Sequence, residues 1–248
     1  MAKQTSRRSK HNGRGAAAVS SAADHTGHDH VYGVLSKALL AGRLKPGSPL
    51  RERHLAEIFN VTRAATRKAL LQLAEEGKLE VFANRGAYVP QPSADAVRRV
   101  YEARKAVEAG LVAVLAGRVT PSQLSKLKAH VAKERHAEQR GERDESVRLA
   151  GAFHSELVAL AENPTLEEIV LRLISRTQIY VALFESARHS GCAPEEHRAI
   201  VDALGKKDAS RAAAAMIHHL QLVEARVSEY MTAHEAENPE DVLRELLS

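Results

Sequence analysis

The sequence is poor in the features that exported, membrane-spanning or disulfide-stabilised proteins need. Its 248 residues include no tryptophan, aromatic residues make up only 4%, and Cys192 is the single cysteine. One cysteine cannot form an intrachain disulfide, which indicates a reducing compartment. No apolar run reaches the roughly eighteen residues of a transmembrane helix, so we expect no membrane segment. With so few aromatic side chains, Leu, Ala and Val must fill the core, which favours a mainly α fold.

Charge is divided unevenly along the chain. Residues 1–92 contain 15 Lys and Arg against 7 Asp and Glu, a net charge of +8. Residues 93–248 contain 21 against 24, a net charge of −3, and the two parts sum to +5. A basic front part joined to a mildly acidic rear part indicates that only the front part binds a polyanion.

Residues 50–89 have the pattern of a helix-turn-helix followed by a β-hairpin. We predict a short helix at 52–59 and, after a tight turn, a second helix that Thr62 caps and Gly77 ends. The buried stripe of this second helix is predicted to consist of Thr66, Ala69, Leu70 and Leu73.

Several side chains of this stretch lie where a winged helix meets DNA. The candidates in the helix-turn-helix are Arg53, Thr62, Arg63 and Arg67. Strands predicted at 79–81 and 87–89 form a wing with Arg85 at its tip, where it can enter the minor groove. The planar fork of an arginine can bond guanine O6 and N7 together. The alternative is a solvated arginine face, but the turn, the capped helix and the wing together favour DNA binding.

These residues resemble the winged helix of the GntR family of bacterial repressors. The matching segments are Gly42-Arg43-Leu44-Lys45-Pro46-Gly47, Arg51-Glu52-Arg53-His54-Leu55-Ala56, Val61-Thr62-Arg63, Ala69-Leu70 and Asn84-Arg85-Gly86. The resemblance covers about residues 31–89 and implies DNA contacts at Arg53, Thr62, Arg63 and Arg67, and at Arg85 and Gly86 of the wing. Ala64 and Ala65 depart from the small polar or proline residues common there. Alanine offers only apolar contact, for instance to a thymine methyl, so the operator sequence is affected rather than the docking mode.

The chain divides at a short linker rich in proline. We expect a disordered basic tail at 1–27 that is not a signal peptide, and a winged helix-turn-helix at 28–89 whose first helix covers 31–41. The linker is 90–93, and a helical domain follows at 94–236 before a C-terminal tail at 237–248. The helical domain is predicted as an antiparallel bundle of six helices, or seven if a break is missed: 95–118, 121–139, 142–162, 165–186, 194–205 and 209–230.

Three histidines of the bundle lie on apolar stripes of three different helices: His154, His197 and His219. A buried neutral imidazole without a partner costs free energy, and a shared metal would satisfy all three. The alternative is three separate, hydrogen-bonded core histidines.

The rear domain also resembles a known module, the FCD effector domain of the FadR-like branch of the GntR family. The resemblance rests on Phe153-His154 with Asn163-Pro164, His197-Arg198-Ala199-Ile200, Asp208 and His219-Leu220. It implies a divalent metal, such as Zn, Ni or Mn, held by three histidines and an aspartate. That aspartate would stand four residues before His154, where this chain has Ala150, so the fourth protein ligand is missing from its usual place.

Arg104 stands within an apolar stripe, and a buried arginine needs an anion. One interpretation is an internal ion pair with Glu108, four residues later. The other, to which the resemblance also points, is a clamp for a carboxylate effector.

Together these features predict a ligand-responsive regulator, expected to be a repressor in the cytoplasm at the nucleoid. We expect a homodimer that binds an inverted-repeat operator in double-stranded DNA and responds to a small carboxylate. The alternative is a metal-dependent hydrolase or lyase that uses the three-histidine centre. That alternative lacks a His-Glu-x-x-His motif and a nearby carboxylate base on the histidine stripes, so we expect no enzyme activity.

Overall fold

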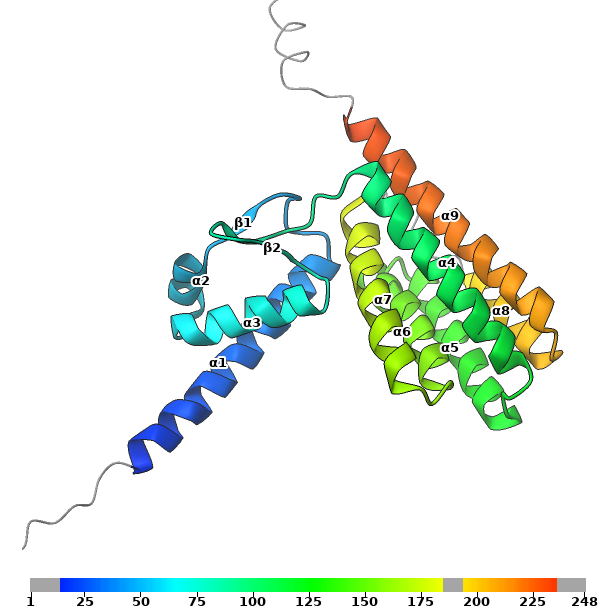
Figure 1. The fold of residues 1–248 in the computed structure, drawn as a ribbon, viewed down its shortest axis with the longest axis horizontal. Helices are drawn as coiled ribbons and strands as arrows, with labels where there is room; N and C mark the ends of the chain where they lie inside the picture. The colour runs from blue at the N-terminus through cyan, green and yellow to red at the C-terminus, as the bar shows by residue number, and fades with distance from the viewer. Residues whose placement is uncertain (1–13, 185–193, 236–248) are drawn as a thin grey trace, which may run out of the picture.

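The computed structural model describes residues 14–184 and 194–235, and the side chains of 26–184 and 194–232 within them. The chain forms an N-terminal winged-helix part and a C-terminal helical bundle, joined side by side (Figure 1). Residues 1–13 of the N-terminal tail expected at 1–27 lie outside the described residues, as do the C-terminal tail expected at 237–248 and the single Cys192. Within those residues, no helix has the length and hydropathy needed to span a membrane.

The N-terminal domain is a helix-turn-helix with a small sheet. Its elements are α1 (Arg14–Leu40), β1 (Pro49–Leu50), α2 (Glu52–Phe59), α3 (Arg63–Glu75), β2 (Glu80–Phe82) and β3 (Gly86–Tyr88). The antiparallel sheet has the strand order β1-β3-β2. The predicted α3 stripe of Thr66, Ala69, Leu70 and Leu73 is buried, and Val31, Leu35 and Leu39 of α1 complete this core.

Two predictions for this domain were wrong in extent. The helix expected at 31–41 begins at Arg14, so residues 14–27 are helical rather than disordered. Five alanines between residues 16 and 23, the residue type with the highest helix propensity, account for the difference. Within the expected loop at 43–49, Pro49 begins β1 and pairs with Tyr88 of β3. Proline is tolerated there because β1 is an edge strand.

The C-terminal domain contains six helices within the described residues, as predicted. They are α4 (Ala94–Ala116), α5 (Pro121–Gln139), α6 (Arg143–Ala159), α7 (Pro164–Phe184), α8 (Pro194–Gly205) and α9 (Ala209–Glu235). Ser93 and Thr120 cap α4 and α5 by accepting bonds from the backbone N–H three residues later. Aliphatic side chains dominate the core, with few buried aromatics such as Tyr101, Phe153 and Tyr180.

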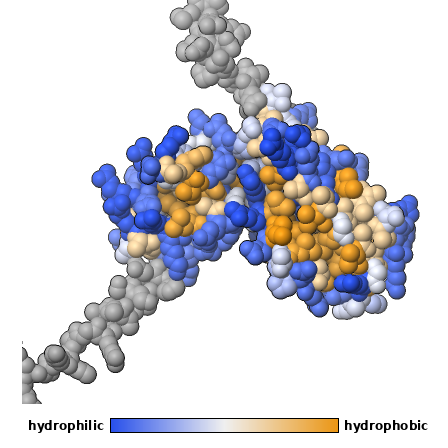
Figure 2. Space-filling view, viewed as in Figure 1, coloured by the Kyte–Doolittle hydropathy of each residue, from blue (hydrophilic) through white to orange (hydrophobic). Residues whose placement is uncertain are grey.

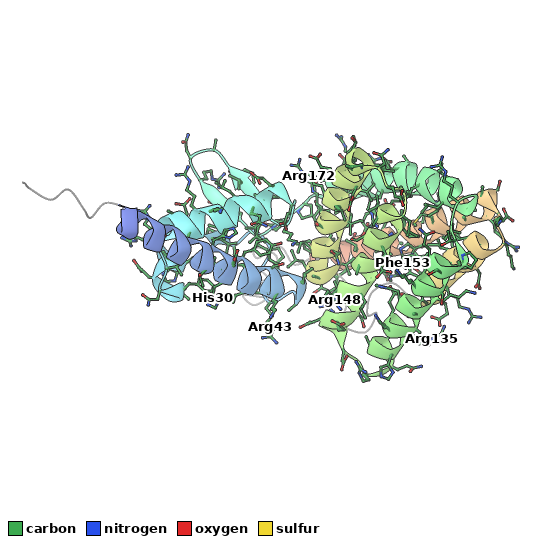
Figure 3. The ribbon with its side chains drawn as sticks, turned by 90° about the horizontal axis from the view of Figure 1, so that it is seen from below. His30, Arg43, Arg135, Arg148, Phe153 and Arg172 are labelled. Atoms are coloured by element: carbon green, nitrogen blue, oxygen red, sulfur yellow. The ribbon has the colours of Figure 1, made fainter. Side chains whose placement is uncertain are left out.

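The helix α7 belongs to the bundle but also contacts the N-terminal domain. Ile179 is fully buried and packs in the core of the N-terminal domain, and Arg143 of α6 donates to the Ala182 carbonyl of α7 at 3.1 Å. Gly42, just after α1, has φ +63°, and a Cβ there would lie 2.3 Å from the Ala182 carbonyl oxygen. Figure 3 shows Arg172 on the side of α7 toward this domain. The two domains therefore meet along α7 as well as through the linker.

Candidate metal centre and DNA-binding surface

The exposed face of α3 carries the residues expected to meet DNA. Arg63, Arg67 and the neighbouring Lys68 are exposed, whereas the opposite face of α3 is buried. Thr62 caps α3 as predicted, because its side-chain oxygen accepts from the Ala65 N–H at 3.1 Å. Lys68 was not among the predicted contacts, although its position next to Arg67 on the same face was a usable signal.

Ala65 does not lie on this face. Its side chain is only 3% exposed, packed in the core of the domain, whereas Ala64 is exposed. Apolar contact to a base is therefore open to Ala64 alone, and the expectation for Ala65 was wrong. The apolar stripe of α3 includes Ala65 because it lies one turn before Ala69.

The predicted arginines make only loose contacts with nearby carboxylates. Arg53 lies 3.7 Å from Glu57, and Arg67 lies 3.9 Å from Glu52 of α2. Exposed pairs of this kind contribute about 0–1 kcal/mol, so both guanidinium groups can exchange these partners for DNA at little cost.

Two aromatic rings hold the arginine at the wing tip. The guanidinium of Arg85 lies 5.8 Å from the ring centroid of Phe82 and 5.7 Å from that of Tyr88, within cation–π range. The rings themselves meet edge to face at 5.4 Å. Gly86, with φ +86°, permits the tight turn beside Arg85. The wing therefore presents Arg85 on a supported hairpin.

The three predicted histidines meet in the centre of the bundle. His154 of α6, His197 of α8 and His219 of α9 are each at most 2% exposed. One ring nitrogen from each lies within 4.8 Å of the others, and Nε2 of His154 is 3.1 Å from Nε2 of His219. The Phe153 ring, seen inside the bundle in Figure 3, stacks on His197 with centroids 4.0 Å apart.

Each imidazole is held by a different glutamate on its outer side. Nδ1 of His154 bonds Glu108 at 2.6 Å, Nδ1 of His197 bonds Glu134 at 2.9 Å, and Nδ1 of His219 bonds Glu196 at 2.7 Å. Sequence reasoning assigned Glu108 only to Arg104, and it missed the other two. Glutamates of this kind orient metal-binding histidines and fix their tautomer.

Protonation at the centre follows from these bonds. Burial alone would raise the pKa of Glu108, but Arg104 and His154 bring it to about 2, so this carboxylate only accepts hydrogen bonds. Burial lowers the pKa of His154 to about 4, against the attraction of Glu108, and burial also lowers the pKa of His219 well below its usual value. Both rings are neutral at pH 7 with the proton on Nδ1, so both Nε2 atoms carry bare lone pairs.

The centre therefore fits a metal ion. The Nε2 lone pairs of His154 and His219 face each other at 3.1 Å, an unfavourable contact that a cation between them relieves. Nε2 of His197 is buried and makes no hydrogen bond within the described part of the chain. Ligand nitrogens on a tetrahedral ion, with bonds of about 2.0–2.1 Å, lie about 3.3 Å apart. The His154–His219 distance of 3.1 Å is close to this value, and all three nitrogens lie within 4.8 Å of one another.

Ala150 lines a small cavity beside the three-histidine centre. The cavity has a volume of about 20 Å³, and its walls include Arg104, Ala150, His154, Thr177 and Gln178. An aspartate at position 150, one turn before His154, would project from this wall. The cavity holds about one water molecule, far less than a typical organic ligand needs.

Arg104 is buried and makes the internal pair that one of the two interpretations proposed. Its Nε donates to Glu108 at 2.6 Å and its Nη1 donates to Thr177 of α7 at 2.8 Å. Arg104 also lines the cavity next to His154. An incoming carboxylate would therefore have to share this guanidinium with Glu108.

A winged helix-turn-helix followed by a helical bundle with a buried histidine centre defines a class of transcription regulator with a separate helical domain. The chain belongs to the GntR family: the model described as "Bacterial regulatory proteins, gntR family" matches residues 28–89, and the FCD domain matches residues 99–222. The resemblance noted in the sequence is thereby confirmed.

Curated relatives agree with this assignment, and a solved structure has a similar fold. The chain is 27% identical over 201 residues to the HTH-type transcriptional repressor RspR of Escherichia coli (strain K12), covering 81% of this chain and 88% of that protein. It is 29% identical over 211 residues to the HTH-type transcriptional regulator LutR of Bacillus subtilis (strain 168), covering 76% and 95%. The fold is similar to that of E. coli McbR/YncC, with a TM-score of 0.70, 22% identity, and coverage of 82% and 97%.

Proposed function

We propose that this regulator is a repressor that binds an inverted-repeat operator as a homodimer and responds to a small organic acid at a metal centre. The observation that carries the ligand response is the convergence of three buried Nε2 atoms, each backed by a carboxylate, beside a cavity lined by Arg104. Such a centre would hold a divalent ion of the zinc, nickel or manganese type through His154, His197 and His219. The ion supplies a positive charge and an open coordination position.

The charge of the site favours an anionic effector. Glu108, Glu134 and Glu196 next to the histidines, with Glu156 beside His130, carry four negative charges, and the cations that contact them, Arg104, His130 and Arg226, carry three positive charges. A divalent ion would therefore leave one positive charge uncompensated, because Ala150 supplies no carboxylate. An acid that brings its own carboxylate would restore neutrality in a buried site.

The binding of such an acid requires the cavity wall to open. The side chain of Gln178 of α7 occupies the space next to Gly151 of α6, where a Cβ would lie 1.8 Å from its Nε2. Its amide donates to the Val147 carbonyl of α6 at 3.2 Å. Displacement of Gln178 is the simplest way to enlarge a cavity of about 20 Å³, and it would move α7 relative to α6.

Movement of α7 offers a direct route to the DNA-binding domain. Thr177 and Gln178 face the cavity, whereas Ile179 packs in the core of the N-terminal domain. The helix α4, which carries Arg104 and follows directly on the linker, is one connection between the cavity and this domain, and α7 provides a second. A ligand that favours one arrangement by about 1–3 kcal/mol changes operator affinity about 5- to 150-fold.

The face of the bundle formed by α4 and α7 supports dimerisation. Val114 of α4 is 52% exposed and Ile169 of α7 is 50% exposed. Figure 2 shows apolar residues gathered on this side of the bundle. A symmetric contact between two copies would cover them and would place two recognition helices on two half-sites.

The enzyme alternative has less support from the centre. A hydrolytic site needs a carboxylate free to activate water, but Glu108, Glu134 and Glu196 each accept a bond from a histidine Nδ1. We propose instead that the metal centre serves as a ligand receptor. The test is fluorescence anisotropy of labelled operator DNA with purified protein, with and without metal and a panel of small organic acids. Failure of every metal and acid combination to change operator affinity would contradict the ligand response.

A further inference from the structure

We infer that three cations, the buried Arg104 and His130 and the half-buried Arg226, are positioning residues that hold the three histidines of the centre through their glutamates. This inference rests on the proposed metal centre and extends it outward by one layer of side chains. The cations touch no atom at the convergence point. Their role is to hold each glutamate in place, so that each Nε2 points inward.

The three arrangements repeat the same order of groups. Arg104 donates to Glu108 at 2.6 Å, and Glu108 holds His154. Arg226 donates to the second oxygen of Glu196 at 3.0 Å, and Glu196 holds His219 through its first.

The third arrangement uses a histidine as its cation. Nε2 of His130 lies 3.4 Å from Glu134, which holds His197 through both carboxylate oxygens at 2.9 Å. His130 and Glu134 are each 4% exposed. The same order of cation, carboxylate and imidazole occurs at all three histidines. We therefore assign the outer cations to the support of the centre.

The hydrogen bonds of His130 require a positive charge on its ring. Nδ1 lies 2.8 Å from a carboxylate oxygen of Glu156, and Nε2 lies 2.9 Å from the backbone carbonyl of Leu149. A carbonyl and a carboxylate only accept, so both ring nitrogens must donate, which only the imidazolium can do. Although burial opposes the charge, Glu134, the Leu149 carbonyl and Glu156 raise the pKa of His130 to about 9.

The cations matter because each one fixes the position of a carboxylate that accepts a hydrogen bond from an imidazole. A carboxylate held in place keeps Nδ1 of the ring directed outward, and Nε2 then faces the centre. Each cation therefore helps to orient a ring for metal binding, without touching the histidine itself.

His130 also ties two metal-binding helices together. From α5 it contacts Leu149 and Glu156 of α6, the helix that carries His154. Through Glu134 it sets the position of His197 on α8. Loss of the His130 ring would leave Glu134 without this partner. It would also remove the hydrogen bonds that hold α5 against α6.

The test is metal affinity, measured on the full chain by chelator competition with Ni²⁺ or Zn²⁺. His130→Gln keeps a hydrogen-bonding side chain but loses the charge. We expect metal binding to weaken about tenfold, because loss of a group that supports a metal ligand typically weakens metal affinity by about 10- to 100-fold. His136→Gln is the matched control, because His136 lies on the same helix but is exposed. Arg226→Met should weaken binding by a similar factor, and Arg226→Lys, which restores the charge, should recover most of the loss.

A second measurement needs no variant. Nitrogen NMR of the metal-free wild-type protein should show a proton on Nδ1 of His154, His197 and His219, and protons on both ring nitrogens of His130. Wild-type affinity in both His130→Gln and Arg226→Met, or an Nε2–H tautomer at the centre, would overturn the inference while leaving the metal centre intact. A wild-type chain that binds no metal would instead overturn the proposed centre and the inference with it.

Discussion

Nε2 of His154 and Nε2 of His219 face each other at 3.1 Å while the Nδ1 atom of each ring is bonded to a glutamate. Two neutral rings with their protons on the outer side cannot form a hydrogen bond across this gap. The contact is therefore unfavourable in the metal-free chain. Packing in the core and the hydrogen bonds to the glutamates hold the two rings in place against it. Metal binding should release this strain.

A divalent ion is accordingly expected to stabilise the chain against heat. At a free ion concentration about 100 times the Kd, a site that exists only in the folded state adds about 2.7 kcal/mol. Thermal melting with Ni²⁺ or Zn²⁺ against a chelator measures the effect. The shift should vanish in a His154→Gln, His219→Gln double variant and persist in His218→Gln, whose side chain is exposed next to His219. An equal shift in the double variant would place the metal elsewhere.

Supplying the missing carboxylate should tighten metal binding. Ala150 is buried at the cavity wall one turn before His154, so an aspartate there can reach the same centre. We expect Ala150→Asp to lower the metal Kd by about tenfold or more, and to weaken the response to acid because the open position is filled. Ala150→Asn, nearly the same shape without the charge, is the control. Equal metal affinities for the two variants would show that the side chain does not reach the ion.

The helices and the histidine centre could be predicted from the sequence because the patterns that indicate them lie within single helices. Thr62, Pro121 and Gly205 mark helix ends through the residue type alone. The apolar periodicity of the helices places the three histidines on inward faces. The glutamates were not accessible, because His197 and Glu134 are 63 residues apart on different helices. Periodicity tells which side of a helix is inward, but it does not tell which helices are neighbours. The two-residue strand β1 was missed because its only signal is pairing with β3.

DNA binding should depend on the exposed face of α3. Arg63→Ala and Arg67→Ala are each expected to cost about 1–3 kcal/mol on the specific operator, because either side chain can bond base edges. Arg53→Ala on α2 should weaken operator and random DNA alike, as expected for a phosphate contact. Arg148→Ala in the helical domain is the control. Anisotropy titrations on both DNAs give the affinities, and wild-type operator affinity for Arg63→Ala would refute the assignment of α3 as the recognition helix.

The raised pKa of His130 predicts a loss of stability at alkaline pH. In the unfolded chain this histidine has a pKa of about 6.5, and in the folded chain it has a pKa of about 9. Its contribution is fully present below pH 6.5 and declines as the pH rises toward 9, by an amount on the order of 1 kcal/mol. Denaturant unfolding at several pH values, with a chelator present, should show this decline in the wild type and a flatter profile in His130→Gln. Parallel profiles would mean that His130 is neutral in the folded chain.

Contact between α7 and the N-terminal domain should be required for the response to acid. Gly42→Ala introduces a Cβ 2.3 Å from the Ala182 carbonyl oxygen, a backbone clash that only separation of the two segments relieves. Gly33→Ala is the matched control in α1, because a Cβ there meets nothing within 4 Å and alanine favours the helix. We expect Gly42→Ala to bind operator within a few-fold of wild type, since α3 is untouched, but to lose most of the acid-induced change in affinity.

Gly42 also has a positive φ, so strain within its own turn must be separated from loss of the contact. Ile179→Ala makes this separation, because it removes an α7 side chain from the core of the N-terminal domain without altering the backbone of that domain. If α7 couples the domains, both variants should respond weakly to acid while Gly33→Ala responds as wild type. A full response in both would assign the coupling to α4, which carries Arg104 and follows directly on the linker, and would leave α7 as a structural contact only.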